Sequence, residues 1–259
     1  MDADEPPPIV LHRRRLFGAR GAIGPSTYFS HASAAVIHGP PLLTRRLSDV
    51  VAVRTGGGHG AVNRTLHARR ASLAAEDVAE VEGLPVTSLA RTVADLVREL
   101  PFPEAVMIAD AGLAKGLDRD ELLERTAKGR GCRMAERALL FADPRSESAG
   151  ESLSRVRFHQ LGPPAPDLQR NLYDARGGFL GRADFWWEEY SLAGEFDGKV
   201  KYGGGLVPGQ NPAEAIMDEK FREQRMIAAG HYLVRWFWEN LWKPGLDVLI
   251  RQAMAWRSR

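Results

Sequence analysis

The sequence predicts an α/β (α+β) fold in two parts: a small α/β domain that ends in helices, and then a mixed sheet with the element order α-β-β-β-α-β. Apolar residues make up 44% of the 259 residues and charged residues 26%, which is typical of a globular protein with a real core. The segment Asp143-Pro144-Arg145-Ser146 marks a boundary. We therefore expect domains over residues 12–145 and 146–259, after a disordered tail over residues 1–11 that is rich in proline and acids.

Short strands and amphipathic helices are expected in the first domain. Ser30 to Gly39 predicts a helix that ends at glycine, with Ser30 as its N-cap. Residues 48–55 are apolar and β-branched, which predicts a strand, and further short strands are expected between Val62 and Val86. Thr87 is the expected cap of the next helix. Further helices are expected over residues 103–116, 119–129 and 133–143.

The second domain has longer and more regular elements. Alternating apolar residues bounded by turns predict strands, and residues with a period of 3.6 predict helices. Helices are expected near residues 150–161 and 212–229 and at the C-terminus, and strands near residues 167–173, 180–187, 192–200 and 231–237.

Positive charge is concentrated towards the N-terminus. Residues 12–70 contain ten arginines and one acid, Asp49, whereas residues 71–150 contain ten basic and fifteen acidic residues. Residues 151–259 are nearly balanced, with fifteen basic and fourteen acidic residues. Two interpretations stay open: the arginines contact the phosphates of a nucleic acid, or they form a solvated surface.

Composition also limits the compartment. The single cysteine, Cys132, excludes an internal disulfide or a cysteine-rich zinc site. The N-terminal residues do not have the pattern of a secretory signal, and no run of about 20 apolar residues suggests a membrane span. We therefore expect a cytoplasmic protein that does not bind membranes.

The expected third strand of the second domain carries the most informative residues. Glu195, Asp197 and Lys199 stand two apart, so a strand directs all three to one side. Asp184 lies in the preceding strand, which we expect to be the antiparallel partner. Carboxylates that converge from adjacent strands provide the hard oxygen ligands that Mg²⁺ or Mn²⁺ prefers.

These residue types suit phosphodiester hydrolysis. A cation held by Asp184 and by Glu195 or Asp197 would lower the pKa of a bound water, and Lys199 would stabilise the developing negative charge. Glu151, on the preceding helix, adds a further acid to this site. A solvated glutamate in the first turn of that helix is the alternative interpretation.

The order of these residues resembles the PD-(D/E)XK nuclease superfamily, closest to the branch of the very-short-patch-repair endonuclease. The resemblance covers roughly residues 147–250 and implies a restriction-endonuclease-like fold. Either Asp197-Gly198-Lys199 or the pair Glu195 and Asp197 corresponds to the (D/E)xK element, so the principal metal ligand stays open. The residues that carry the resemblance are Asp184, Glu195-Phe196-Asp197-Gly198-Lys199, Glu219-Lys220-Phe221-Arg222-Glu223 and Val234-Arg235-Trp236.

The first domain resembles a different family, the antitoxins of type IV abortive-infection systems. The resemblance rests on the stretch from Ser30 to Gly39 and on the stretch from Gly83 to Leu96. Members of that family usually carry a winged-helix DNA-binding segment before the first stretch, and the 29 residues here are too few for one. His31 and His38 are interpreted as packed or capping histidines, since no third metal ligand accompanies them.

Two functions follow from these resemblances. The first is a metal-dependent endonuclease that hydrolyses DNA phosphodiester bonds in defence or repair. The alternative is a non-catalytic, antitoxin-like, nucleic-acid-binding regulator that retains a nuclease fold. DNA, a toxin partner or a second copy of the chain are the partners that these functions imply.

Overall fold

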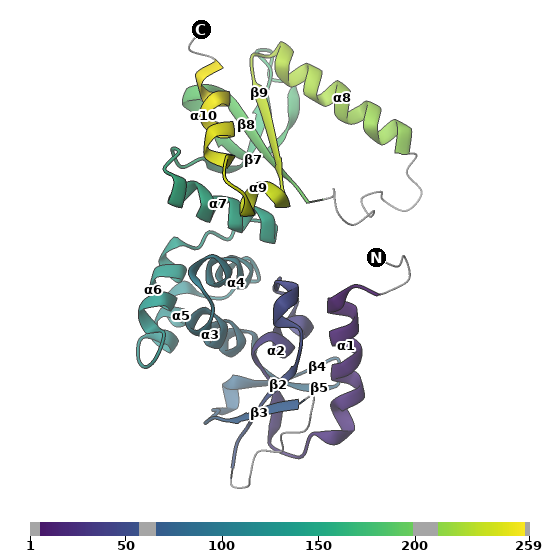
Figure 1. The fold of residues 1–259 in the computed structure, drawn as a ribbon, viewed down its shortest axis with the longest axis vertical. Helices are drawn as coiled ribbons and strands as arrows, with labels where there is room; N and C mark the ends of the chain where they lie inside the picture. The colour runs from purple at the N-terminus through teal and green to yellow at the C-terminus, as the bar shows by residue number, and fades with distance from the viewer. Residues whose placement is uncertain (1–5, 57–65, 199–211, 257–259) are drawn as a thin grey trace. The chain divides into compact units, whose positions relative to one another are not determined.

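The computed structural model describes residues 6–56, 66–198 and 212–256 and divides the chain into two compact units, Met1–Ala149 and Gly150–Arg259. Each unit has its own sheet and its own buried apolar cluster. The predicted α+β class is confirmed, because helices and mixed sheets occur in both units (Figure 1).

The described part of the first unit contains a five-stranded sheet in the order β3-β2-β1-β5-β4. Its strands are β1 (Thr27–Phe29), β2 (Val50–Arg54), β3 (Leu66–Arg70), β4 (Val78–Val81) and β5 (Leu84–Thr87). The central strand β1 pairs antiparallel with β2 and parallel with β5, where Phe29 stands opposite Val86. Phe29 and Val86 are fully buried, so this junction lies in the core of the unit.

Apart from the first helix, which was not predicted, the helices of the first unit follow the order predicted from the sequence. They are α1 (Pro8–Ala19), α2 (His31–His38), α3 (Leu89–Glu99), α4 (Phe102–Ala114), α5 (Arg119–Thr126) and α6 (Cys132–Phe141), with short 3-10 turns at Arg20–Ala22, Thr44–Arg46 and Ala75–Asp77. Helix α2 contacts both the sheet and α3, and α3 to α6 pack together as a bundle (Figure 1). Gly39 ends α2 with φ of 93°, as expected for a glycine at this position.

The predicted disordered tail over residues 1–11 is wrong for its last part, because α1 begins at Pro8. Proline is well suited to the first turn of a helix, where its missing N–H has no intrahelical partner. The helix is fixed by its buried face, where Leu16 joins the core and His12 is fully buried. The His12 ring bonds the Leu47 carbonyl and the Ser33 hydroxyl, both at 3.1 Å.

The predicted cap of α3 is displaced by one residue. The Ser88 hydroxyl accepts a hydrogen bond from the backbone N–H of Arg91 at 3.3 Å, so Ser88 and not Thr87 caps the helix. Thr87 is the last residue of β5, and its hydroxyl lies 2.7 Å from that of Thr92. Thr87 therefore ties the strand to the first turn of the helix.

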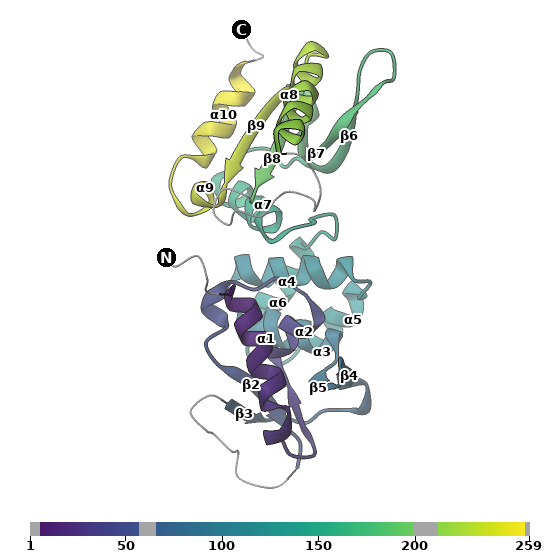
Figure 2. The same ribbon diagram turned by 90° about the vertical axis from the view of Figure 1, so that its right-hand side faces the viewer.

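The second unit has the predicted order α-β-β-β-α-β, followed by two C-terminal helices. Its elements are α7 (Ala149–Leu161), β6 (Asp167–Tyr173), β7 (Phe179–Trp187), a 3-10 turn (Glu188–Tyr190), β8 (Leu192–Asp197), α8 (Pro212–Ala228), β9 (Tyr232–Phe237), α9 (Trp238–Trp242) and α10 (Leu246–Trp256). The described sheet has the order β6-β7-β8-β9, antiparallel except for the parallel pair β8 and β9 (Figure 2). Helices α8 and α10 both pack against β9.

Helices α7 and α8 cover opposite faces of this sheet. The ring of Phe158 on α7 lies 5.4 Å from each of the rings of Phe185, Trp187 and Trp236. Met226 on α8 instead belongs to a buried cluster with Trp186, which points to the other side of β7. Successive residues of β7 therefore fill two separate apolar layers.

We expect Gly150→Ala to destabilise the second unit by about 1–3 kcal/mol. The added Cβ would stand 1.8 Å from Cε1 of Phe196, whose ring is held edge-on against Trp238 at 5.1 Å between centroids. The matched control is Gly198→Ala, whose Cβ would meet Phe196 and Trp238 at 3.5 and 3.6 Å. Urea denaturation followed by circular dichroism compares the two variants, and equal midpoints would contradict this packing.

Candidate functional site

The acids predicted to form a site lie on β7 and β8, next to the end of the ladder between these two strands. Asp184 is on β7, and Glu195 and Asp197 are on β8, with Asp197 as the last residue of that strand. The β7–β8 ladder pairs Phe185 with Gly194, so Asp184 and Glu195 are the residues next to this pair on neighbouring strands. Lys199 lies outside the described residues.

Next to the end of the β7–β8 ladder, the side chain of Asp184 takes the place of a backbone carbonyl as a hydrogen-bond acceptor. Its Oδ2 accepts a hydrogen bond from the backbone N–H of Phe196 at 3.0 Å. Burial raises the pKa of Asp184 to about 6, the negative charges of Glu151 and Glu195 add to the rise, and the hydrogen bonds from Phe196 and Gln169 oppose it. Glu151 and Glu195 therefore both lie close enough to Asp184 to change its titration.

Glu151 is buried, with only 7% of its surface exposed, so the interpretation as a solvated first-turn glutamate is wrong. Its Oε2 accepts a hydrogen bond from Nε2 of Gln169 on β6 at 2.8 Å. Gln169 was missed by the sequence prediction. It has φ of 53° within a strand, and its Oε1 is buried without a hydrogen-bond partner among the described residues. Only the β6–β7 register, which places Gln169 near Asp184, would have revealed it.

Glu195 has a different environment from Asp184. Its Oε1 binds Nη2 of Arg222 on α8 at 2.7 Å, and its Oε2 binds Nε of Arg235 on β9 at 2.8 Å. Glu219 binds the same two arginines, and the hydrogen bond from Arg222 is the main cause of its lowered pKa. Glu219, Arg222 and Arg235, which belong to the segments that resemble the nuclease superfamily, thus form one ion-pair cluster with Glu195.

These contacts decide which residues fit a metal ion. The described residues contain no group of three or more His, Cys, Asp or Glu side chains placed to hold one. Mg²⁺ commonly takes only one or two carboxylates and fills its other positions with water and substrate oxygens. Asp184 and the unpaired amide oxygen of Gln169 fit that kind of site. Glu195 does not, because both of its oxygens are bound to guanidinium groups.

The arginines of the first unit are engaged largely within the unit. Several arginines between residues 12 and 70 form ion pairs with acids from the following segment: Arg13 with Glu82, Arg45 and Arg46 with Glu104, and Arg69 with Glu99. Glu104 is only 3% exposed, so its two arginines neutralise a buried charge. The charge asymmetry along the sequence is therefore partly cancelled in the fold.

The two stretches that resemble antitoxins meet in the structure. Nε2 of His38, at the end of α2, lies 2.7 Å from the Thr87 carbonyl of β5. Arg91 of α3 binds both Asp95 and Asp77, and Arg125 of α5 binds Asp77 as well. These residues join the sheet to the helical bundle, which agrees with the interpretation of His38 as a packed histidine.

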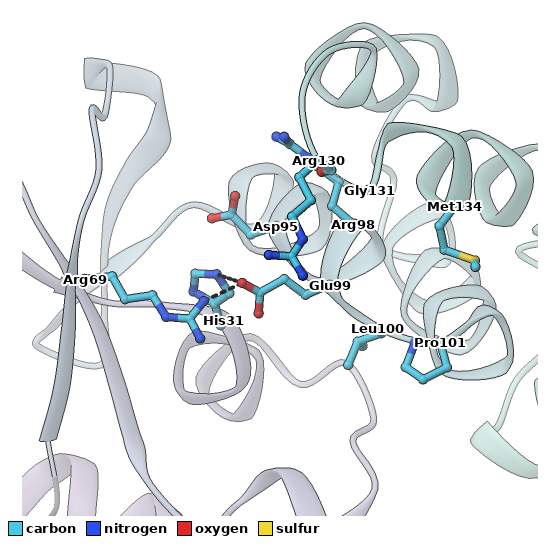
Figure 3. Close-up of a pocket in the computed structure, with 10 residues that line it drawn as sticks. All are labelled: His31, Arg69, Asp95, Arg98, Glu99, Leu100, Pro101, Arg130, Gly131 and Met134. Atoms are coloured by element: carbon cyan, nitrogen blue, oxygen red, sulfur yellow. Dashed lines mark hydrogen bonds and ion pairs between the residues drawn. The ribbon is translucent and has the colours of Figure 1, made fainter.

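A cavity of about 990 Å³ lies within the first unit (Figure 3). Its lining residues are His31, Arg69, Asp95, Arg98, Glu99, Leu100, Pro101, Arg130, Gly131 and Met134. Nε2 of His31 lies 3.4 Å from Oε1 of Glu99, and Arg69 binds the same carboxylate. The hydrogen bond from His31 is the main cause that lowers the pKa of Glu99 to about 2.

Comparison with known protein families finds a match within the first unit. Residues 29–141 match the AbiEi antitoxin C-terminal domain. The match runs from β1 to α6 and includes every residue that lines the cavity. The antitoxin resemblance predicted for the first domain is therefore confirmed at the level of this domain.

Two uncharacterized proteins, from two strains of Mycobacterium tuberculosis, are each 36% identical to the chain over 143 residues. The aligned region is 54% of this chain and 50% of each relative, so the chain spans about half the length of these relatives. No solved structure matches the chain significantly. None of the reported matches names a nuclease. Among the described residues, no helix combines the length and the apolar composition of a membrane span.

The raised pKa of Asp184 leads us to expect a loss of stability as the pH rises. The carboxyl titrates near 3.8 in the unfolded chain and at about 6 in the folded chain, so the folded chain binds more protons in between. The free energy of unfolding therefore falls as the pH rises through this interval. Asp184→Asn removes the titration and should gain about 1–3 kcal/mol relative to the wild type between these two pH values. Urea denaturation at pH values near 4 and 7 measures this change, and a constant difference between the two proteins would contradict it.

Proposed function

We propose that the chain is an antitoxin-like regulator whose first unit neutralises a toxin partner. The match of residues 29–141 to an antitoxin domain carries this proposal. It spans the sheet and the helical bundle of the unit, and only α1 and the 3-10 turn after it precede the match among the unit's described helices and strands.

The contacts inside the first unit support a protein-binding role more than a DNA clamp. Arg13, Arg45, Arg46 and Arg69 bind carboxylates of their own unit, so their charge is not fully available to phosphates. DNA binding remains part of the proposal only to the extent that the other arginines of the unit contact phosphates. The cytoplasm, where a toxin would act, is the compartment that fits this role.

We expect the full chain to restore growth when it is co-expressed with a toxin that an AbiEi antitoxin neutralises, raising colony counts at least about tenfold. The double change Arg45→Ala and Arg46→Ala should abolish the rescue, because a buried Glu104 without its arginines costs about 3 kcal/mol or more. Asp184→Asn should rescue as well as the wild type, because it changes only the second unit. Well-expressed, folded wild-type protein that gives no rescue would refute the proposal.

A metal-dependent nuclease is the second candidate, and the convergence of acids on Asp184 favours it. Asp184 and the Gln169 amide would hold Mg²⁺ or Mn²⁺, which supplies an activated water and a Lewis acid for phosphodiester hydrolysis. The chain's own contacts prepare this position: Phe196 N–H orients the Asp184 carboxylate, and Glu151 holds the Gln169 side chain. In this function Arg222 and Arg235 keep Glu195 neutralised rather than available as a ligand.

If the second unit is a nuclease, the full-length protein should cleave plasmid, linear or single-stranded DNA in the presence of Mg²⁺. Cleavage should stop when EDTA is added. Asp184→Asn should then be slower by on the order of a hundredfold. Asp174→Asn is the matched control, because asparagine can also form the turn in which Asp174 Oδ1 accepts N–H groups from Arg176 and Gly178. Cleavage that persists in EDTA, or is absent in folded protein, would refute this candidate and leave the antitoxin proposal intact.

A further inference from the structure

We propose that the cavity of the first unit binds a small organic phosphate of about the size of a mononucleotide. The cavity is lined by segments that lie far apart in the sequence: α2, β3, the end of α3, the link between α3 and α4, the loop between α5 and α6, and the start of α6 (Figure 3). No contact described for the antitoxin-like unit needs such a space.

Charge is the first observation that points to an anion. Arg69, Arg98 and Arg130 line the cavity, against the two acids Asp95 and Glu99. Asp95 is already bound by Arg91, which does not line the cavity, at 2.9 Å. Glu99 is already bound by Arg69 and His31. Arg98 and Arg130 remain, and neither has a carboxylate partner among the described residues.

The position of these two arginines is fixed by the backbone. Nε of Arg98 donates to the Arg130 carbonyl at 3.1 Å, which leaves the two terminal nitrogens of Arg98 for another acceptor. Gly131 has φ of 82°, and a Cβ there would stand 2.2 Å from the Arg98 carbonyl oxygen. The loop can therefore approach the end of α3 only with glycine, and this approach sets Arg130 beside Arg98. Arg98 and Arg130 both line the cavity, and a guanidinium group is well suited to bind a phosphate.

His31 provides a second constraint at the same cavity. It has φ of 51°, an unfavourable conformation for a residue with a side chain, which is the type of strain that clusters at ligand sites. Nδ1 of His31 lies 3.0 Å from the Ser30 hydroxyl, while Nε2 faces Glu99. Figure 3 shows His31 and Arg69 both directed at the Glu99 carboxylate. These contacts offset part of the negative charge of Glu99.

The rest of the lining and the volume favour an organic phosphate over a free phosphate ion. Leu100, Pro101 and Met134 give the cavity an apolar wall, which suits a flat ring. A volume of about 990 Å³ is at the upper end of the range for small-molecule sites and is far larger than one phosphate group requires. A phosphate on the arginines and a ring on the apolar wall would use both features.

Isothermal titration calorimetry on the full chain tests this site with AMP, adenosine and inorganic phosphate as probes. AMP should bind with a stoichiometry of one and at least about tenfold more tightly than either adenosine or phosphate alone, because only AMP reaches both the arginines and the apolar wall. Arg98→Gln and Arg130→Gln should each weaken AMP binding at least about tenfold. The matched control is Arg133→Gln, an exposed arginine on α6 that does not line the cavity, and it should bind AMP as the wild type does.

Glu99→Gln gives a result that a merely structural role would not produce. It removes the negative charge nearest the site and releases Arg69, so AMP should bind severalfold more tightly. Absence of AMP binding, equal affinities for AMP and adenosine, or an equal loss in Arg133→Gln would each overturn the proposal. A hexaglutamate peptide that binds more tightly than AMP and depends on Arg98 would also overturn it, in favour of an acidic protein segment.

Discussion

Several carboxylates of low exposure are each neutralised by two arginines, and this occurs in both units. The pairs are Arg45 and Arg46 on Glu104, Arg91 and Arg125 on Asp77, and Arg222 and Arg235 on Glu195. Each carboxylate lies on or beside one element, and the arginines that bind it lie on other elements. Because an unpaired buried charge costs several kcal/mol, these ion pairs fix how helices sit against the sheets. The cavity and the Asp184 region both form around elements held in this way.

The second unit could be predicted from its sequence because its elements are long and regular. Strands β6 and β7 have seven and nine residues, and turns separate them clearly. The first unit was harder, since its strands have only three to five residues. Helix α1 was missed because prolines suggest disorder, although they also favour a helix start. The cap of α3 was missed by one residue because Thr87 and Ser88 have equal capping chemistry, and only β5 decides between them.

The spacing of Asp184, Glu195 and Asp197 was enough to place these acids on neighbouring strands. It was not enough to distinguish their roles. Glu195 is bound by arginines that follow it by 27 and 40 positions, whereas Asp184 is left with an amide, a backbone N–H and a second buried acid. Gln169 was invisible to the sequence for a similar reason, since its position depends on the register of β6. Long-range contacts, rather than local pattern, therefore decide which acid of the predicted site can change its protonation near neutral pH.

The aromatic layers of the second unit have a practical consequence for optical measurements. All six tryptophans of the chain lie at or after residue 186, and the first unit has none. Trp187 and Trp236 are buried against Phe158, and the Trp236 indole N–H donates to the Ser154 hydroxyl at 2.7 Å. Intrinsic tryptophan emission therefore reports on one unit alone, while far-ultraviolet ellipticity reports on both. The tryptophans are therefore an intrinsic fluorescent probe of the second unit, and comparison with ellipticity shows which unit a denaturant or a bound molecule disturbs.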